Sequence, residues 1–138
     1  MKLKSYLIFF LVLILFTCCK VEEKKCDINR FEVTATAYNS LAYQTNFNPF
    51  ITAFGDSLKP GLRYIAVSRD LLDSGLVHNT KVKIEGFDSI FIVKDKMNKR
   101  WRKRIDIYMG LDVKKAKNWG KRKVHIEYCL PVDDADSN

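Results

Sequence analysis

Apolar and polar residues alternate along several short segments of the chain, which is the pattern of strands that bury one face. Residues 31–38 open this pattern, with inward positions at Phe31, Val33, Ala35 and Ala37. Residues 81–85 repeat it with Val82 and Ile84 inward, whereas the apolar run 90–93 predicts a strand buried on both faces. These segments predict a mainly β domain.

The second half of the chain adds two more alternating segments. In residues 104–109 the apolar side chains share one face, and Asp106 and Tyr108 are on the other. The carboxyl of Asp106 is therefore expected to border a groove. In residues 123–129 the same alternation directs His125 outward, while its neighbours Val124 and Ile126 face the core.

Irregular and helical segments separate the strands. Residues 39–61 are rich in Asn, Ser, Pro and Gly without periodicity, and a loop of this length is expected to line the groove. Residues 64–67 form a short apolar run, and residues 69–73 predict one helical turn. Asp112 is placed to cap a short helix that ends at Gly120. The expected domain therefore has about six strands and one or two short helices.

The N-terminal residues predict export. Lys2 and Lys4 precede an apolar run over residues 6–16, which is too short to cross a bilayer as a helix and is typical of a signal peptide. Leu15 to Cys18 resembles the lipobox of bacterial lipoproteins, which implies that residues 1–17 are removed and that Cys18 carries the lipid. Cys19 as the anchor and an ordinary cleaved signal stay open as alternatives.

Three further regions follow from composition. Residues 18–29 are expected to be the lipidated N-terminus and a charged, flexible tether, residues 30–130 the domain, and residues 131–138 an acidic disordered tail. Export favours disulfides, and Cys26 and Cys129 bracket the domain. A bridge between them is predicted, with two unpaired thiols as the alternative.

The charge of the chain indicates an anionic counterpart. The formal net charge is +8, and seven basic residues lie within 94–104 and six within 114–123. A basic block around Trp101 is compatible with nucleic acid, but an exported protein is expected to meet an anionic envelope polymer or lipid surface instead. A solvated basic face is the simpler alternative. His78 and His125 have no companion ligands at metal spacing, so neither a metal nor a cofactor is expected.

Several segments resemble, in order, the 3D (three-aspartate) domain family, which is related to the catalytic barrel of MltA-type lytic transglycosylases. The matching segments are VTATAY (33–38), TAFG (52–55), YIAVSRDLL (64–72), NTKVKIEG (79–86), IVKD (92–95), RIDIYMG (104–110) and AKNWGKRKV (116–124). The resemblance implies a six-stranded double-psi β-barrel that binds peptidoglycan glycan strands in a groove.

The resemblance also assigns roles to residues. It implies that Asp106 is the catalytic acid/base and that Asp70 and Asp95 complete the three aspartates. Lys81 is expected near Asp106. Thr52 and Tyr38 are expected as further groove residues. One carboxyl suffices for a lytic transglycosylase, because it protonates the glycosidic oxygen and then takes the proton of the sugar's own 6-hydroxyl.

Two functions are carried forward. The first is a lipid-anchored lytic transglycosylase that cleaves the MurNAc-GlcNAc bond with a 1,6-anhydro product, facing the periplasm from the outer membrane. The second is a non-catalytic peptidoglycan-binding or accessory lipoprotein on the same barrel. It is kept because residues 96–103 contain no glycine where the family has a Gly-rich run, and glycine lets a backbone approach a ligand closely. A basic module that binds an anionic polymer or a protein is a third possibility.

Overall fold

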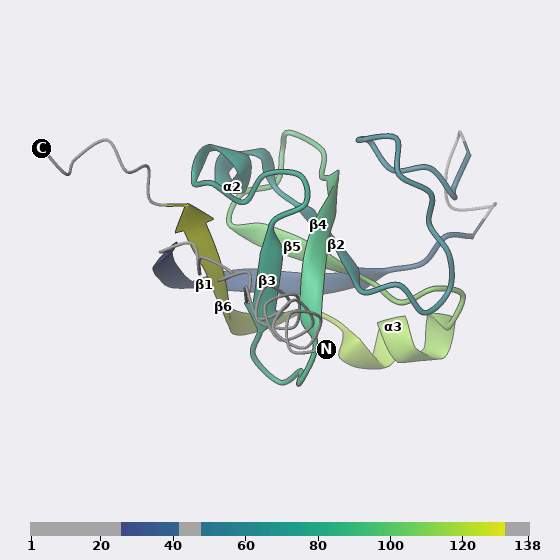
Figure 1. Cartoon of the computed structure of the whole chain (residues 1–138). Coiled ribbons are helices and arrows are strands. Elements are labelled where there is room, and N and C mark those ends of the chain that lie inside the picture. Colours follow the sequence, from purple (N-terminus) through teal and green to yellow (C-terminus); the bar gives the residue numbers. More distant parts are fainter. Residues whose placement is uncertain (1–25, 42–47, 132–138) are drawn as a thin grey trace, which may run out of the picture.

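The structure is a computed structural model that describes residues 26–41 and 48–131. Within these residues it contains six strands and two short helices, which confirms the expected mainly β domain. The strands are β1 (Cys26–Tyr38), β2 (Tyr64–Val67), β3 (Lys81–Ile84), β4 (Ile90–Lys96), β5 (Arg104–Tyr108) and β6 (Arg122–Pro131). The helices α2 (Arg69–Asp73) and α3 (Val113–Trp119) lie at opposite ends of the strands (Figure 1).

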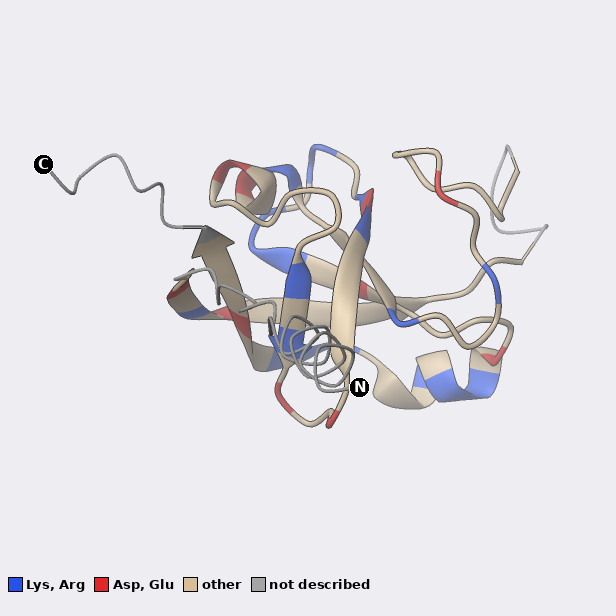
Figure 2. Ribbon diagram, viewed as in Figure 1, with Lys and Arg blue, Asp and Glu red and all other residues tan. Residues whose placement is uncertain are grey.

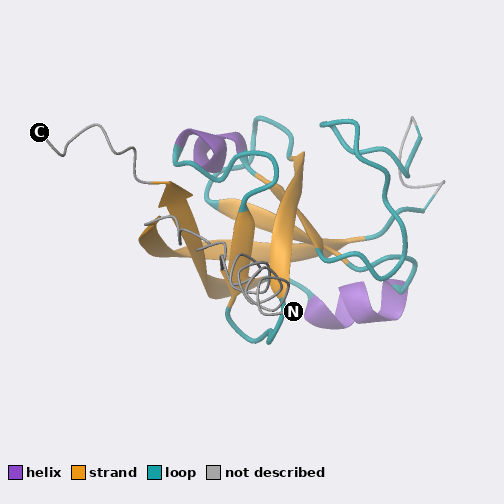
Figure 3. Cartoon of the chain, in the orientation of Figure 1, coloured by secondary structure: helices purple, strands orange, loops and turns teal. Residues whose placement is uncertain are grey.

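The strands close into a barrel in the order β1-β5-β2-β4-β3-β6. Two pairs, β1 with β5 and β2 with β4, are parallel, and the remaining pairs are antiparallel. Figure 3 shows the strands crossing one another around the common core. This closed arrangement with two interleaved parallel pairs is the double-psi β-barrel that was expected.

Alternate side chains of each strand fill the barrel. Branched aliphatic residues dominate this interior because they pack well on a pleated surface. Those with 0 or 1% exposure include Val33, Ile65, Val67, Val82, Ile84, Val93, Ile105, Ile107 and Ile126. The residues between them point outward, and β5 therefore presents Asp106 on the outer face while it buries both of that residue's neighbours.

Strand β4 departs from the sequence prediction. The run 90–93 was expected to be buried on both faces, but Ile90 is 49% exposed while Phe91 and Val93 are buried. That prediction is wrong because a small barrel has a single interior, which only every second residue can reach. Strand β4 also continues to Lys96, so Asp95 lies within the strand.

The last helix agrees with its predicted boundaries. The Asp112 side chain accepts a 2.8 Å hydrogen bond from the Lys115 N–H and caps α3. Gly120 ends the helix with φ 65°, a value that glycine adopts readily. Trp119 packs on the ring of Phe87, with 5.0 Å between centroids, and holds the helix against the end of the barrel.

A disulfide joins the first and last strands. Cys26 and Cys129 are bonded, with 5.4 Å between their Cα atoms and 103 residues of sequence separation. The predicted bridge is thus confirmed. Strand β1 starts at Cys26, five residues before the predicted start, because Cys26–Ala35 pairs with β6 along its whole length.

Candidate active site

Asp106 and Asp95 lie in one row of residues that crosses four strands. Asp106 on β5 is paired with Thr36 on β1 and with Ala66 on β2. Ala66 is paired in turn with Asp95 on β4, at a register shift in that ladder. Because adjacent strands are about 4.8 Å apart, the two aspartate Cα atoms are about 10 Å apart with only an alanine between them. We call Thr36, Asp106, Ala66 and Asp95 the acid row.

The surroundings of the Asp106 carboxyl favour its protonated form. Burial raises its pKa to about 6, although the Thr36 hydroxyl and the Arg104 guanidinium lower it, and the charge of Asp95 raises it further. Thr36 Oγ1 donates a 2.9 Å hydrogen bond to Asp106 Oδ1. A carboxyl with this pKa can both give and take a proton near neutral pH.

Asp95 is held by the backbone. Its Oδ1 accepts hydrogen bonds of 2.8 Å from the N–H of Ala53 and of 2.8 Å from the N–H of Lys96. Burial raises the pKa of Asp95, and these two donors counteract part of that rise. Asp95 is therefore a fixed carboxyl, attached to the turn at residues 52–56 that crosses beside the acid row.

Tyr38 adds a phenol to the same face. Its ring lies 5.4 Å from that of Tyr108, its partner on β5. Burial raises the pKa of Tyr38, as do the charges of Asp95 and Asp106, so the phenol keeps its proton. Among the described residues its buried hydroxyl has no hydrogen-bond partner. An unpaired donor beside two carboxyls is suited to binding a polar group of a ligand.

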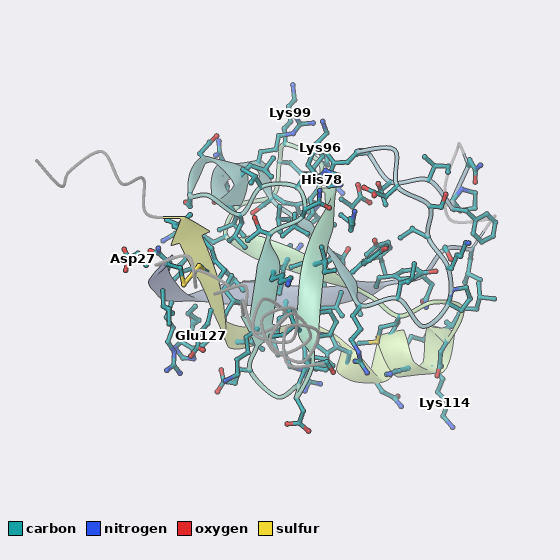
Figure 4. The ribbon with its side chains drawn as sticks, in the orientation of Figure 1. Asp27, His78, Lys96, Lys99, Lys114 and Glu127 are labelled. Carbon is teal, nitrogen blue, oxygen red and sulfur yellow. A yellow bond between two sulfur atoms is a disulfide. The ribbon has the colours of Figure 1, made fainter. Side chains whose placement is uncertain are left out.

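A charged cluster fastens the turn at residues 52–56. Asp56 Oδ1 accepts a 2.7 Å hydrogen bond from Lys94 Nζ, and Asp56 Oδ2 lies 2.6 Å from His78 Nε2. The hydrogen bond from Lys94 lowers the pKa of Asp56, despite an opposing effect of burial, and His78 lowers it further. Phe54 stacks on His78 at 4.9 Å and lies under Lys96 at 5.3 Å. Figure 4 shows His78 and Lys96 together at this end of the domain.

Thr52 belongs to the same turn. Its side chain is buried, and its Oγ1 accepts a 3.0 Å hydrogen bond from the Asp56 N–H. Thr52 thereby shapes the turn whose next residue, Ala53, donates to Asp95. This contact brings the predicted groove residue Thr52 close to the acid row.

Asp70 lies outside the acid row. It is the second residue of α2, four residues beyond Ala66, and its Oδ2 accepts a 2.8 Å hydrogen bond from the Lys103 N–H. Burial tends to raise the pKa of Asp70, but the donors Lys103 and Ser68 outweigh it and lower the pKa. In this position Asp70 orders the connector that leads into β5, where Lys103 has φ 44°.

Lys81 also lies apart from the row. It is exposed on β3, and strands β4 and β2 intervene between β3 and β5. Its Cα partner is Ile92 on β4. The structure thus unites Asp95, Asp106, Tyr38 and the turn that contains Thr52, and it separates Asp70 and Lys81 from them.

The aromatic residue of the basic connector already has a partner. Arg104 is 9% exposed, and its guanidinium lies 3.9 Å from the ring centroid of Trp101, with Arg100 at 4.8 Å. Cation–π contacts of this kind hold Trp101 in place. They also keep the Arg104 charge close to Asp106, whose pKa it lowers.

Comparison with known proteins bears on the fold. No family model and no curated protein matches the chain. Solved structures do match. An apo expansin of Clavibacter michiganensis is 18% identical with a TM-score of 0.46, and the match covers 79% of this chain and 53% of that one. MltA from E. coli is 14% identical with a TM-score of 0.45, over 64% of this chain and 29% of that one.

This chain therefore spans about half the length of the expansin and less than a third of that of MltA. The likeness to both concerns the fold alone. Within residues 26–41 and 48–131, no cluster of His, Cys, Asp or Glu has the makings of a metal site, and neither helix is long and apolar enough to cross a membrane. Cys18, the predicted lipid attachment site, lies outside the described residues.

Sequence reasoning missed Thr36 and the Asp56 cluster. The alternation of residues 31–38 does put Thr36 on the polar face, opposite Val33 and Ala35. Its contact with Asp106, 70 residues away, depends on the parallel pairing of β1 with β5. That pairing joins strands that are distant in sequence, and residue patterns contain no signal for it.

Proposed function

We propose that this protein cleaves peptidoglycan glycan strands as a lytic transglycosylase, with Asp106 as the acid/base. The observation that carries the proposal is the half-buried Asp106 carboxyl, whose pKa is raised to about 6 beside a second, fixed carboxyl. The resemblance of the sequence to the 3D domain supports a glycan substrate. Asp95, Tyr38 and the turn containing Thr52 supply polar groups around the reacting bond.

In the proposed reaction Asp106 gives its proton to the glycosidic oxygen as the bond to the sugar's anomeric carbon breaks. The carboxylate that remains takes the proton of the 6-hydroxyl of the same sugar, and that oxygen closes the 1,6-anhydro ring. Asp106 thus returns to its starting state without water. Burial, with a smaller contribution from the charge of Asp95, raises the proton affinity of Asp106, and the negative charge of Asp95 would stabilise the positive charge that develops on the sugar.

The proposal is tested by digesting purified sacculi with wild-type protein and with Asp106→Asn, which keeps the shape and removes the proton carrier. We expect 1,6-anhydro-muropeptides from the wild type in mass spectra, and none from the variant, with circular dichroism and sacculus binding unchanged. Reducing ends in place of anhydro ends would indicate hydrolysis through a second carboxylate. A folded wild type that binds sacculi and releases nothing would refute the enzyme.

A non-catalytic glycan-binding role is the second candidate. It is favoured by the glycine-free connector 96–103 and by the two backbone donors that already occupy Asp95 Oδ1. Under this alternative, Asp106→Asn and the wild type would co-sediment with sacculi equally, and neither would release fragments.

We further propose that the protein is held at the outer membrane, facing the periplasm, by a lipid on Cys18. A lipoprotein with several acyl chains would remain firmly attached, whereas one chain binds only marginally. Mass spectrometry of the membrane fraction is expected to find Cys18 as a lipidated N-terminus. Lipid on Cys19, or an unmodified N-terminus in the soluble fraction, would contradict it.

A further inference from the structure

A small cavity opens at the end of the barrel that α3 covers. Its volume is about 190 Å³, and the rings of Phe87, Phe91 and Tyr108 together with Met109 contribute to its lining. Most of the accessible lining is polar, so the cavity combines aromatic rings with a polar surface. The volume is below the range of about 300–1,000 Å³ usual for drug-sized ligands, so the cavity suits one small group of a larger molecule.

The charged residues that line this cavity have one sign. Arg63, just before β2, and Lys115, in the first turn of α3, contribute to its lining, and the lining contains no Asp or Glu. No salt bridge among the residues that the structure describes involves Arg63 or Lys115. Two further cavities differ, because acidic residues line both of them. The barrel-end cavity therefore favours an anion.

The cavity adjoins the acid row. Tyr108 lines it and follows Asp106 by two residues on β5, which is about 7 Å along a strand. Both side chains lie on the outer face of that strand. Tyr108 is fixed by a 2.8 Å hydrogen bond with Ser40 and by its contact with the ring of Tyr38. A ligand whose reacting bond lies at Asp106 would thus reach the cavity with an adjacent substituent.

We propose that this cavity is a carboxylate-binding subsite, in which Arg63 and Lys115 bind the acidic substituent of a muramoyl sugar. The inference rests on the proposed function, because it names the feature of the glycan that the same site selects. N-acetylmuramic acid differs from N-acetylglucosamine by a lactyl ether, which adds one methyl and one carboxylate. The methyl suits the aromatic rings of the lining, and the carboxylate suits the two cations.

The carboxylate has two possible sources on a glycan strand. In strands without stem peptides it is the lactyl carboxylate itself. In strands with stem peptides the lactyl carboxyl is an amide, and the nearest carboxylate belongs to the peptide. Both present an anion next to the muramoyl ring, and neither is present on a chitin-type glycan.

The subsite is tested by NMR titration of the full chain with N-acetylmuramic acid, N-acetylmuramoyl-L-alanyl-D-isoglutamine and N-acetylglucosamine. We expect the acidic sugars to shift the amide signals of residues 61–63 and 108–110 and to bind about tenfold more tightly than N-acetylglucosamine. Arg63→Gln and Lys115→Gln should each weaken this binding about threefold, the effect of an exposed charge pair. Tighter binding of the peptide-bearing or the peptide-free sugar identifies the source.

Lys114→Gln is the matched control, because it removes the same charge from the adjacent position of α3. Figure 4 shows Lys114 pointing away from the domain. The affinity of the Lys114→Gln variant for the acidic sugars is therefore expected to equal that of the wild type. Equal affinity for all three sugars, no binding of any, or equal effects of Lys114→Gln and Lys115→Gln would overturn the subsite.

The digestion of sacculi separates this inference from the proposed function. If the wild type cleaves sacculi but binds the three sugars equally, the subsite proposal is refuted and the proposed function stands. Charge-selective binding without cleavage would leave the subsite in place and remove the catalytic role of Asp106.

Discussion

At the scale of single residues, the position of Asp106 disfavours the ionised form of its carboxyl. In the folded protein its pKa is about 6, against 3.8 as the ordinary value, and burial is the main cause. The folded state therefore retains a proton that the unfolded chain has already lost between about pH 4 and pH 6. Stability falls as the pH rises through this interval, so ionised Asp106 destabilises the folded protein at neutral pH.

Replacing Asp106 by Asn should therefore stabilise the protein at pH 7. A gain of up to about 3 kcal/mol is expected, since a tenfold change in proton affinity corresponds to about 1.4 kcal/mol. The gain should disappear below about pH 4, where Asp106 is protonated in both states. Urea unfolding at the two pH values measures it. Asp73→Asn at an exposed position is the control, and an equal gain there, or a gain that persists at low pH, would contradict the prediction.

Thr36 tunes the same carboxyl. Its hydroxyl donates to Asp106 and stabilises the charged form, so Thr36→Val should raise the pKa of Asp106 and move the alkaline limb of the activity profile to higher pH. Thr34→Val, on the same face of β1, is a matched control that should leave the profile in place. NMR titration of the carboxyl gives the same information without activity, and an unchanged Asp106 pKa would refute the role.

The sequence predicted individual residues unevenly. Alternation along residues 104–109 was enough to turn Asp106 outward, because β5 obeys the two-residue period. The residues that surround Asp106 were not predictable in the same way. Asp95 and Thr36 reach it only through the order of strands around the barrel, and Asp70 instead binds the Lys103 N–H.

At the scale of elements, prediction was best where local chemistry decides. Asp112 and Gly120 bound α3 because capping and a positive φ act within one turn. The start of β1 and the exposed side of β4 were missed, because partners from distant segments determine them. The fold as a whole followed from the resemblance, since short strands alone are compatible with many barrels.

A disulfide lies at the open end of the pairing between β1 and β6. In the chain-entropy model a loop of 103 residues contributes about 4–5 kcal/mol at most. Replacing both Cys26 and Cys129 by Ser should lower the free energy of unfolding by an amount up to this value. Denaturant unfolding measures the loss, and hydrogen exchange is expected to increase first in residues 26–30. Equal stability of the two proteins would contradict a structural role for the bridge.

At the scale of the whole molecule, the surface is basic. Figure 2 shows Lys and Arg on α3, on the strands and on the connectors between them, and the formal net charge is +8. Attraction to an anionic polymer should therefore contribute to binding at long range and be sensitive to salt.

Binding to sacculi should weaken between about 0.1 M and about 1 M NaCl, because the Debye length shortens from about 10 Å to about 3 Å. Co-sedimentation of the Asp106→Asn variant measures this without cleavage. Uncharged chitin serves as the comparison, and its binding is expected to stay constant. A loss of equal size on chitin would show that salt acts on the protein and not on the attraction.

The bridge between Cys26 and Cys129 also has a mechanical consequence. A pull that reaches the barrel through the residues before Cys26 would, without it, load the antiparallel β1–β6 ladder from its end and open it one rung at a time. With the covalent link part of the tension passes directly into β6 at Cys129, and the end of the ladder is held closed. The bridge should therefore make the barrel more resistant to a pull on its N-terminal end.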